Sequence, residues 1–197
     1  MSLNTRLFLD VNRFSRETGW LHPIATAYIT VAIGALAVLI LTGVALARHR
    51  SAQTMAAAVW SGLAGLVAVA LSQPLIHALN EKRPFVALHH VLVLTHHSAD
   101  PGLPSDHATL AGGILAGLFL VDRRLGAVAT AIGVVLAADR VYVGVHYPGD
   151  VVAGLAVGAL VAVLGWLLLR RLLTAVVSRL RSGPLRRLLT ADGAPNS

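Results

Sequence analysis

Four short clusters of polar and charged residues lie at the ends of long apolar stretches of the chain. They contain residues of types that handle phosphate, namely Lys82, Arg83, Ser105, His107, Arg140, His146 and Asp150. Arginine matches phosphate oxygens with a bidentate fork and keeps its charge. Serine hydroxyls and the amides at helix N-termini are further donors to an anion. This combination is typical of an anion cradle, and phosphate is the biological anion that fits it best.

The two histidines add chemistry to this cradle. A histidine can attack phosphorus as a nucleophile or donate a proton to a leaving group. Asp150 follows His146 by four residues, close enough to accept the second N–H of the imidazole. Such a contact would stabilise the positive charge that forms on attack. From the residues alone, either His107 or His146 can be the nucleophile.

A metal site is the alternative use of histidine in this chain. His89, His90, His96 and His97 form a histidine-rich segment near Asp100, and such segments can bind zinc or copper. No ligand spacing here is diagnostic, so we expect neither a metal nor another cofactor. The chain has no cysteine, which excludes disulfides and thiolate chemistry.

The elements that position these residues are expected to be membrane helices. The chain is 56% hydrophobic and 13% charged, whereas soluble domains carry about 25% charged residues. A span needs roughly 20 apolar residues. Five stretches approach that length, at 24–47, 55–80, 104–121, 125–142 and 150–169. We therefore predict an all-α, polytopic membrane helix bundle with about five transmembrane helices.

The two ends of the chain differ from this central region. Residues at about 5–20 predict an amphipathic helix on the membrane surface. We expect residues 1–173 to form one domain with that interfacial helix. Residues 174–197 are interpreted as a basic tail that ends in disorder.

Because successive spans cross the membrane in opposite directions, all four polar clusters lie on the same side of it. Ten of the 16 Lys and Arg residues then lie on the opposite side, which the positive-inside rule makes cytoplasmic, with the C-terminus. The +7 charge is interpreted as loop charge, so no nucleic acid partner is expected. Small-xxx-small pairs at Gly113 and Gly117, and at Gly154 and Gly158, predict close packing that joins the starts of the third and fifth spans.

Three of these clusters together resemble the signature blocks of a known family. Arg83-Pro84, then Pro104-Ser105-Asp106-His107, then Arg140 with His146 and Asp150 are similar to K-x6-R-P, P-S-G-H and S-R-x5-H-x3-D. These are the blocks of the type 2 phosphatidic acid phosphatase superfamily, and here they cover residues 83–150.

The resemblance implies a role for each matching residue. His146 would be the nucleophile that forms a phosphohistidine, oriented by Asp150, and His107 would protonate the departing oxygen. The phosphate oxygens would be held by Arg83, Arg140, Ser105 and the backbone amide of Asp106. Members of the family need no metal, since fixed positive charges stabilise the transition state.

Three positions depart from the family pattern. Ile76 stands where the family has a lysine, for which Lys82 is a candidate substitute, and Asp139 replaces a serine. Asp106 replaces a glycine, and P-S-D-H-A resembles the bacterial undecaprenyl-diphosphate phosphatases of the bacitracin-resistance type. That resemblance implies hydrolysis of undecaprenyl diphosphate to undecaprenyl phosphate and inorganic phosphate, in cell-wall lipid recycling, at the extracytoplasmic face of the bacterial plasma membrane.

Two other functions stay open at this point. The substrate can be another lipid phosphate, such as phosphatidic acid, phosphatidylglycerol phosphate or a prenyl-phosphosugar phosphate. A chain without the family lysine can also be a non-catalytic protein that binds lipid phosphates. The expected partners are the lipid substrate and membrane lipids, and the sequence predicts neither protein partners nor an oligomeric state.

Overall fold

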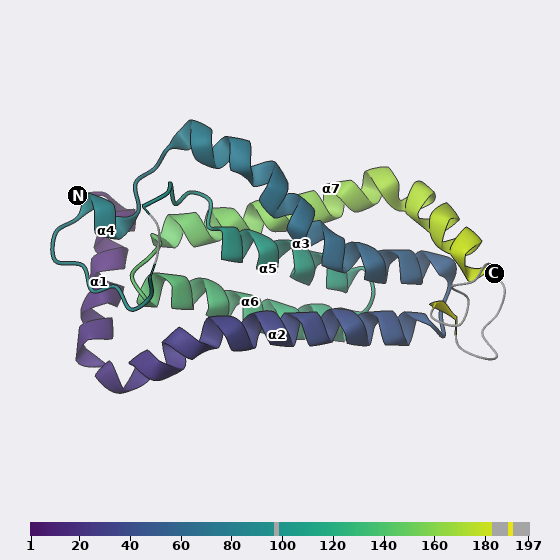
Figure 1. Cartoon of the computed structure of the whole chain (residues 1–197), viewed down its shortest axis with the longest axis horizontal. Coiled ribbons are helices and arrows are strands. Elements are labelled where there is room, and N and C mark those ends of the chain that lie inside the picture. The colour runs from purple at the N-terminus through teal and green to yellow at the C-terminus, as the bar shows by residue number, and fades with distance from the viewer. Residues whose placement is uncertain (97–98, 183–188, 191–197) are drawn as a thin grey trace.

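The computed structural model describes residues 1–96, 99–182 and 189–190. Five helices run side by side along its long axis (Figure 1), and no strand occurs in the described residues. Their bounds are α2 His22–Ala47, α3 Ala52–Leu79, α5 Asp106–Phe119, α6 Arg123–Tyr142 and α7 Pro148–Arg181. The predicted all-α helix bundle is therefore confirmed.

Four helical segments in the described residues are long and apolar enough to cross a membrane. They are Gly19–Ala47, Ala52–Ala87, Arg123–Tyr142 and Pro148–Arg181. Large apolar side chains point outward from them, and Leu168 for example is 82% exposed. Outward apolar surface of this extent is expected of a protein that is solvated by lipid. The fifth helix, α5, has only 14 residues, fewer than the predicted span 104–121.

The short helix α5 packs against α3, α6 and α7. On its α7 side, a Cβ added to Gly158 would collide with the carbonyl oxygen of Thr109, so this glycine permits the close approach of the two helices. Gly113 and Gly117 instead face α3, which differs from the predicted pairing with α7. Because α5 lies closely between α3 and α7, it needs small residues on both of these sides. Gly112 faces α7, where an added Cβ would meet the backbone of Leu155.

The N-terminal helix α1 (Leu3–Glu17) lies across one end of the bundle (Figure 1). Ser2 caps it, since its hydroxyl accepts a hydrogen bond from the Thr5 amide at 3.2 Å. A short 3₁₀ helix, Gly19–Leu21, joins it to α2. At the other end of the chain, α7 extends to Arg181, so 174–181 of the expected tail is helical. Arg186, Arg187 and residues 191–197 lie outside the described residues.

The polar clusters gather at the end of the bundle that α1 crosses. That end holds the C-terminus of α3, the one-turn helix α4 (Pro84–Ala87), the starts of α5 and α7, and the C-terminus of α6 (Figure 1). The α2–α3 and α5–α6 connections lie at the opposite end, where Arg50 lies 3.4 Å from Asp122. The alternation of helix directions thus separates the phosphate-handling residues from the arginine-bearing connections.

Candidate active site

His146 lies in the turn 143–147 that connects α6 to α7. Gly144 has φ +87°, a left-handed conformation that costs glycine little. A Cβ added there would also collide with the carbonyl oxygen of Leu92. The turn is held from outside by a hydrogen bond from the Leu94 amide to the Val143 carbonyl, at 3.0 Å. Glycine at position 144 therefore allows the tight turn that places His146 directly before the start of α7.

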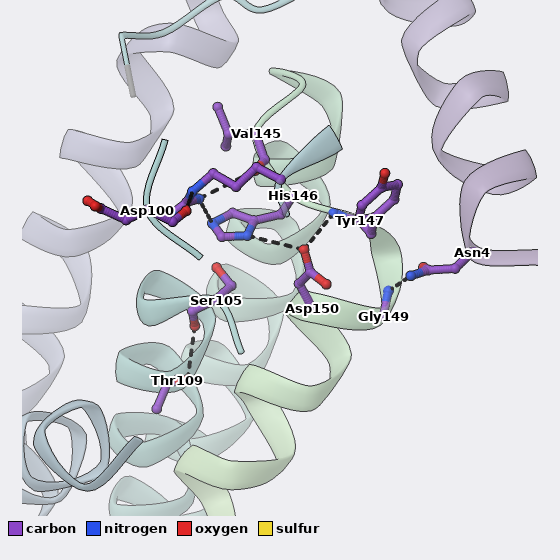
Figure 2. Close-up of polar contacts among 10 residues, drawn as sticks. Asn4, Asp100, Ser105, Thr109, Val145, His146, Tyr147, Gly149 and Asp150 are labelled. Carbon is purple, nitrogen blue, oxygen red and sulfur yellow. Dashed lines mark hydrogen bonds and ion pairs between the residues drawn. The ribbon is translucent and has the colours of Figure 1, made fainter. Parts of the chain in front are cut away.

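The His146 ring is buried between a guanidinium and a carboxylate. Arg83 NH1 lies 2.9 Å from Nε2, and Asp150 Oδ2 lies 3.4 Å from Nδ1 (Figure 2). A guanidinium can only donate, so Nε2 accepts from Arg83 and the ring proton is on Nδ1, facing the carboxylate. Burial, together with the charges of Arg83 and Arg140, lowers the pKa of His146 to about 3. The ring is therefore neutral at physiological pH, with its lone pair on Nε2.

Asp150 is fixed by the start of α7. Its Oδ2 accepts a hydrogen bond from the Tyr147 amide at 2.9 Å (Figure 2), which satisfies a donor at the helix N-terminus. Its own carbonyl accepts from the Ser105 amide at 3.1 Å. This last bond joins the starts of α5 and α7, so the carboxylate and Ser105 keep a constant separation.

Arg83 and Lys82 point in different directions although they are adjacent. Asn80 ends α3 in a left-handed conformation, and Arg83 is extended. Successive side chains alternate in extended chain, and Arg83 is buried while Lys82 is exposed. Arg83 Nε donates to the Asp100 carbonyl at 2.8 Å. Lys82 makes no hydrogen bond or ion pair to the other candidate residues in the described part of the chain.

The second guanidinium comes from the last turn of α6. Arg140 is 2% exposed, and its NH1 lies 3.8 Å from Asp139 Oδ2. Asp139, which stands in the place of the family serine, thus pairs with Arg140. Arg140 NH2 lies 3.5 Å from the hydroxyl of Thr95. Its Nε has no hydrogen-bond partner in the described residues, which leaves one buried donor available to an anion.

The start of α5 supplies the remaining candidates. Ser105 is fully buried, and its hydroxyl, which Figure 2 shows on the side of His146, has no partner in the part of the chain described. His107 lies close enough to Arg140, His146 and Arg83 to sense their charges. The Asp106 carboxylate turns toward α3, where it accepts a hydrogen bond from Gln73 Nε2 at 3.1 Å.

Position 76 and the histidine-rich segment do not contribute side chains to this cluster. Ile76 is buried within α3, so the family lysine has no equivalent at that position. His89, His90 and His96 are exposed, and no group of three metal-ligating side chains forms among the described residues. His97 lies outside them.

Gly102 was not predicted as part of the site. A Cβ there would lie 3.0 Å from Arg83 Cγ and 3.5 Å from Asp150 Oδ2, and the Gly102 backbone hydrogen-bonds to His146. The available signal was its place in the Pro-Gly-Leu-Pro stretch that precedes Ser105, since such stretches mark tight loops.

The site as a whole suits transfer of a phosphoryl group to histidine. A neutral imidazole lies beside two buried guanidiniums, a serine hydroxyl and a helix N-terminus, which match the charge of a transferring phosphoryl group. The sequence profile of the PAP2 superfamily matches residues 57–173, which contain every residue of this cluster. The chain therefore belongs to the PAP2 superfamily, as the three blocks indicated, and is a membrane lipid phosphatase by family.

Similar proteins add detail to this assignment. Undecaprenyl-diphosphatase BcrC of Bacillus subtilis is 29% identical over 162 residues, covering 82% of each chain. The lipid A 1-phosphatase of Rhizobium johnstonii is 41% identical over 99 residues, which are 50% of this chain and 36% of that protein. The crystal structure of Aquifex aeolicus LpxE matches with a TM-score of 0.66 at 21% identity, over 83% of this chain and 94% of LpxE, and supports the fold.

Proposed function

We propose that this protein hydrolyses undecaprenyl diphosphate to undecaprenyl phosphate and inorganic phosphate through a phosphohistidine. The observation that carries the chemistry is the His146 ring, held neutral between Arg83 at Nε2 and Asp150 at Nδ1. The substrate class is supported by the similarity to undecaprenyl-diphosphatase BcrC along most of both chains.

In the first step, Nε2 of His146 attacks the terminal phosphorus of the diphosphate. The bond from that phosphorus to the bridging oxygen breaks, and its electron pair leaves with undecaprenyl phosphate. Burial and the nearby charges of Arg140, His146 and Arg83 lower the pKa of His107 to about 4, so His107 first takes up a proton when the anionic diphosphate binds and then donates it to the departing oxygen. The Nδ1 proton stays with the ring, and the negative charge of Asp150 stabilises the cation that forms.

In the second step, water attacks the phosphohistidine. His107, now without its proton, accepts a proton from the water as the new bond to phosphorus forms. The nitrogen–phosphorus bond breaks, its electron pair returns to Nε2, and inorganic phosphate leaves. The two steps consume one water and restore both histidines.

Arg83 has two successive partners in this scheme. Its NH1 donates to the lone pair that must attack, at 2.9 Å. The guanidinium therefore has to turn toward the phosphate oxygens before Nε2 can reach phosphorus. Charge-assisted bonds to a dianionic group are stronger than a bond to a neutral imidazole, so the substrate itself drives this exchange. Arg140 Nε and the Ser105 hydroxyl supply further donors.

We place the site at the extracytoplasmic face of the bacterial plasma membrane, with the C-terminus in the cytoplasm. Support comes from the connections at the opposite end of the bundle, which carry Arg48, Arg50, Arg123 and Arg124. Positive loops of this kind stay in the cytoplasm. Undecaprenyl diphosphate released during polymer assembly would then reach the site from the outer leaflet.

A second candidate substrate is the phosphate of a lipid A-type lipid. The lipid A 1-phosphatase is 41% identical over its 99 matched residues, whereas BcrC is 29% identical over 162, although the lipid A match covers a smaller part of both chains. Turnover measured side by side on undecaprenyl diphosphate, lipid A and phosphatidic acid separates these substrates. A much higher kcat/KM on either of the last two would contradict the undecaprenyl assignment.

The decisive test is phosphate release from undecaprenyl diphosphate by the purified protein in excess EDTA. We expect release by the wild type and by His89→Ala, because His89 is exposed. His146→Ala should release none while it keeps the wild-type unfolding temperature. If well-folded wild type releases no phosphate from any of the three lipids, with or without divalent metal, the proposal fails and the alternative of a non-catalytic lipid-phosphate-binding protein is favoured.

A further inference from the structure

The N-terminal helix α1 is attached to the loops that carry the site. Its buried residues Phe8, Asn12 and Ser15 recur about once per turn and face the protein. Asn12 Nδ2 donates to the Leu92 carbonyl at 2.8 Å, and its Oδ1 accepts from the Leu92 amide at 3.1 Å. This paired contact satisfies both backbone groups of one residue, as a neighbouring strand would.

Two further contacts join α1 to the turn that holds His146. Asn4 Oδ1 accepts a hydrogen bond from the Gly149 amide in the first turn of α7, at 2.8 Å (Figure 2). The Phe8 ring packs edge-on against Tyr147, with ring centroids 5.4 Å apart. Both partners lie within three residues of His146.

The segment 91–95 transmits these contacts to the site. Leu92 meets Asn12 on one side and closely approaches Gly144 on the other. Two residues on, the Leu94 amide bonds the Val143 carbonyl. Thr95 then reaches Arg140 NH2 at 3.5 Å. Segment 91–95 therefore lies between α1 and the turn, bonded to Asn12 through Leu92 and to Val143 through Leu94.

We propose that α1 is a positioning element of the active site, in which Asn12 fixes segment 91–95 and thereby the placement of Arg140 and the His146 turn. This inference rests on the proposed phosphatase function, in which Arg140 and His146 act on the phosphoryl group. Asn12 is a positioning residue, since it contacts neither the Arg140 guanidinium nor the His146 ring. Asn4, also in α1, binds the Gly149 amide at the start of α7 and so holds the end of the same turn.

The test compares variants of the full-length enzyme on undecaprenyl diphosphate. Asn12→Leu retains similar volume and removes both bonds to Leu92. We expect kcat to fall roughly 10- to 100-fold with little change in KM, because displacement of catalytic groups by about 1 Å has effects of this size. Asn12→Gln keeps a donor and an acceptor and should recover part of the loss. The matched control is Asp10→Asn, on the same helix at an exposed position, which should behave as wild type.

A double variant tests whether the effect passes through segment 91–95. Thr95→Val removes the hydroxyl near Arg140 and leaves the α1 contact intact. If both residues act through one path, the Asn12→Leu/Thr95→Val enzyme should lose less activity than the product of the single losses. Fully multiplicative losses, or wild-type kcat in Asn12→Leu, would overturn the proposal.

Hydrogen exchange separates this inference from the proposed function. Amides of segments 91–95 and 143–147 should exchange faster in Asn12→Leu than in Asp10→Asn, whatever the substrate. Faster exchange in a protein that hydrolyses no lipid phosphate would support the attachment and reject the enzyme. Unchanged exchange in an active protein would reject the attachment and leave the enzyme. Asn4→Ala, at the edge of α1, should raise exchange at 147–150 if the start of α7 depends on it.

Discussion

At the scale of single residues, the neutral state of His146 follows from its surroundings. Burial disfavours a charged ring, and two guanidiniums disfavour it further, so the pKa falls to about 3. In the proposed mechanism, a nucleophile that stays unprotonated keeps its lone pair over the whole physiological range. The same low pKa has a consequence for stability.

The free energy of unfolding that His146 contributes should decrease as the pH is lowered. An unfolded histidine has a pKa of about 6.5, above the folded value, so the unfolded chain binds the proton first as pH falls. The contribution is therefore intact above about pH 6.5 and is lost toward about pH 3, with roughly 2–3 kcal/mol lost by about pH 4.5. Thermal unfolding in detergent should show a larger drop in Tm between neutral pH and that pH for wild type than for His146→Gln. Equal drops would contradict the assigned pKa.

The adjacent residues Lys82 and Arg83 should contribute differently to catalysis. Arg83 is buried against His146, whereas Lys82 is exposed. Arg83→Lys cannot reproduce the planar fork, and we expect kcat/KM to fall about 10²- to 10³-fold, the usual effect of removing one transition-state donor. Lys82→Ala should stay near wild type in steady-state kinetics. A large rise in KM for Lys82→Ala would show that Lys82 takes the place of the family lysine.

At the scale of elements, α5 positions the start of the site because α3 and α7 both approach it closely. Gly158 meets the Thr109 carbonyl of α5, and Gly113 meets the backbone of α3 at Gly65. These contacts align the start of α5 with that of α7, where Ser105 bonds the Asp150 carbonyl. The geometry around His146 thus depends on glycines two to four turns away.

Gly158→Ala should separate α5 from α7. The added methyl group would collide with backbone, which cannot rotate away, and overpacking of this kind costs about 1–3 kcal/mol. We expect a lower Tm and reduced turnover. Gly34→Ala is the matched control, because a Cβ at Gly34 meets nothing within 4 Å. A wild-type Tm for Gly158→Ala would indicate that the helices do not pack this closely.

The sequence predicted the long helices and the residues at their ends, because apolar length and family spacing are both local signals. It did not predict the attachment of α1. Asn12 and Leu92 are separated by 80 positions, and neither residue type marks such a pair. The direction of Lys82 was also hidden, since it depends on the left-handed Asn80 that ends α3. Contacts of this kind are decided by tertiary packing.

At the scale of the whole molecule, the two ends of the bundle differ in charge and in chemistry. The end with His146 carries the cluster, and the other carries the arginine-bearing connections. The chain contains no cysteine, so single cysteines report on either end without background.

Labelling of intact cells should reveal the orientation. A membrane-impermeant maleimide should modify His89→Cys, in the exposed loop after α4, from outside. Arg124→Cys, exposed at the start of α6, should react only after the cells are permeabilised. The reverse pattern would place the catalytic end in the cytoplasm, and the supply of substrate would then have to come from the inner leaflet.

The short length of α5 has a further consequence for how the enzyme meets its substrate. Its 14 residues rise about 21 Å, less than the roughly 30 Å of hydrocarbon in a bilayer. The other end of α5 lies beside the α2–α3 connection, where Arg50 contacts Val121 and Asp122, so the start of α5, with Ser105, is recessed below the level that a full span would reach. A lipid head group can arrive there by lateral diffusion without leaving the bilayer. The rate would then follow the mole fraction of substrate in the membrane, and dilution with inert lipid would slow the reaction even at constant bulk concentration.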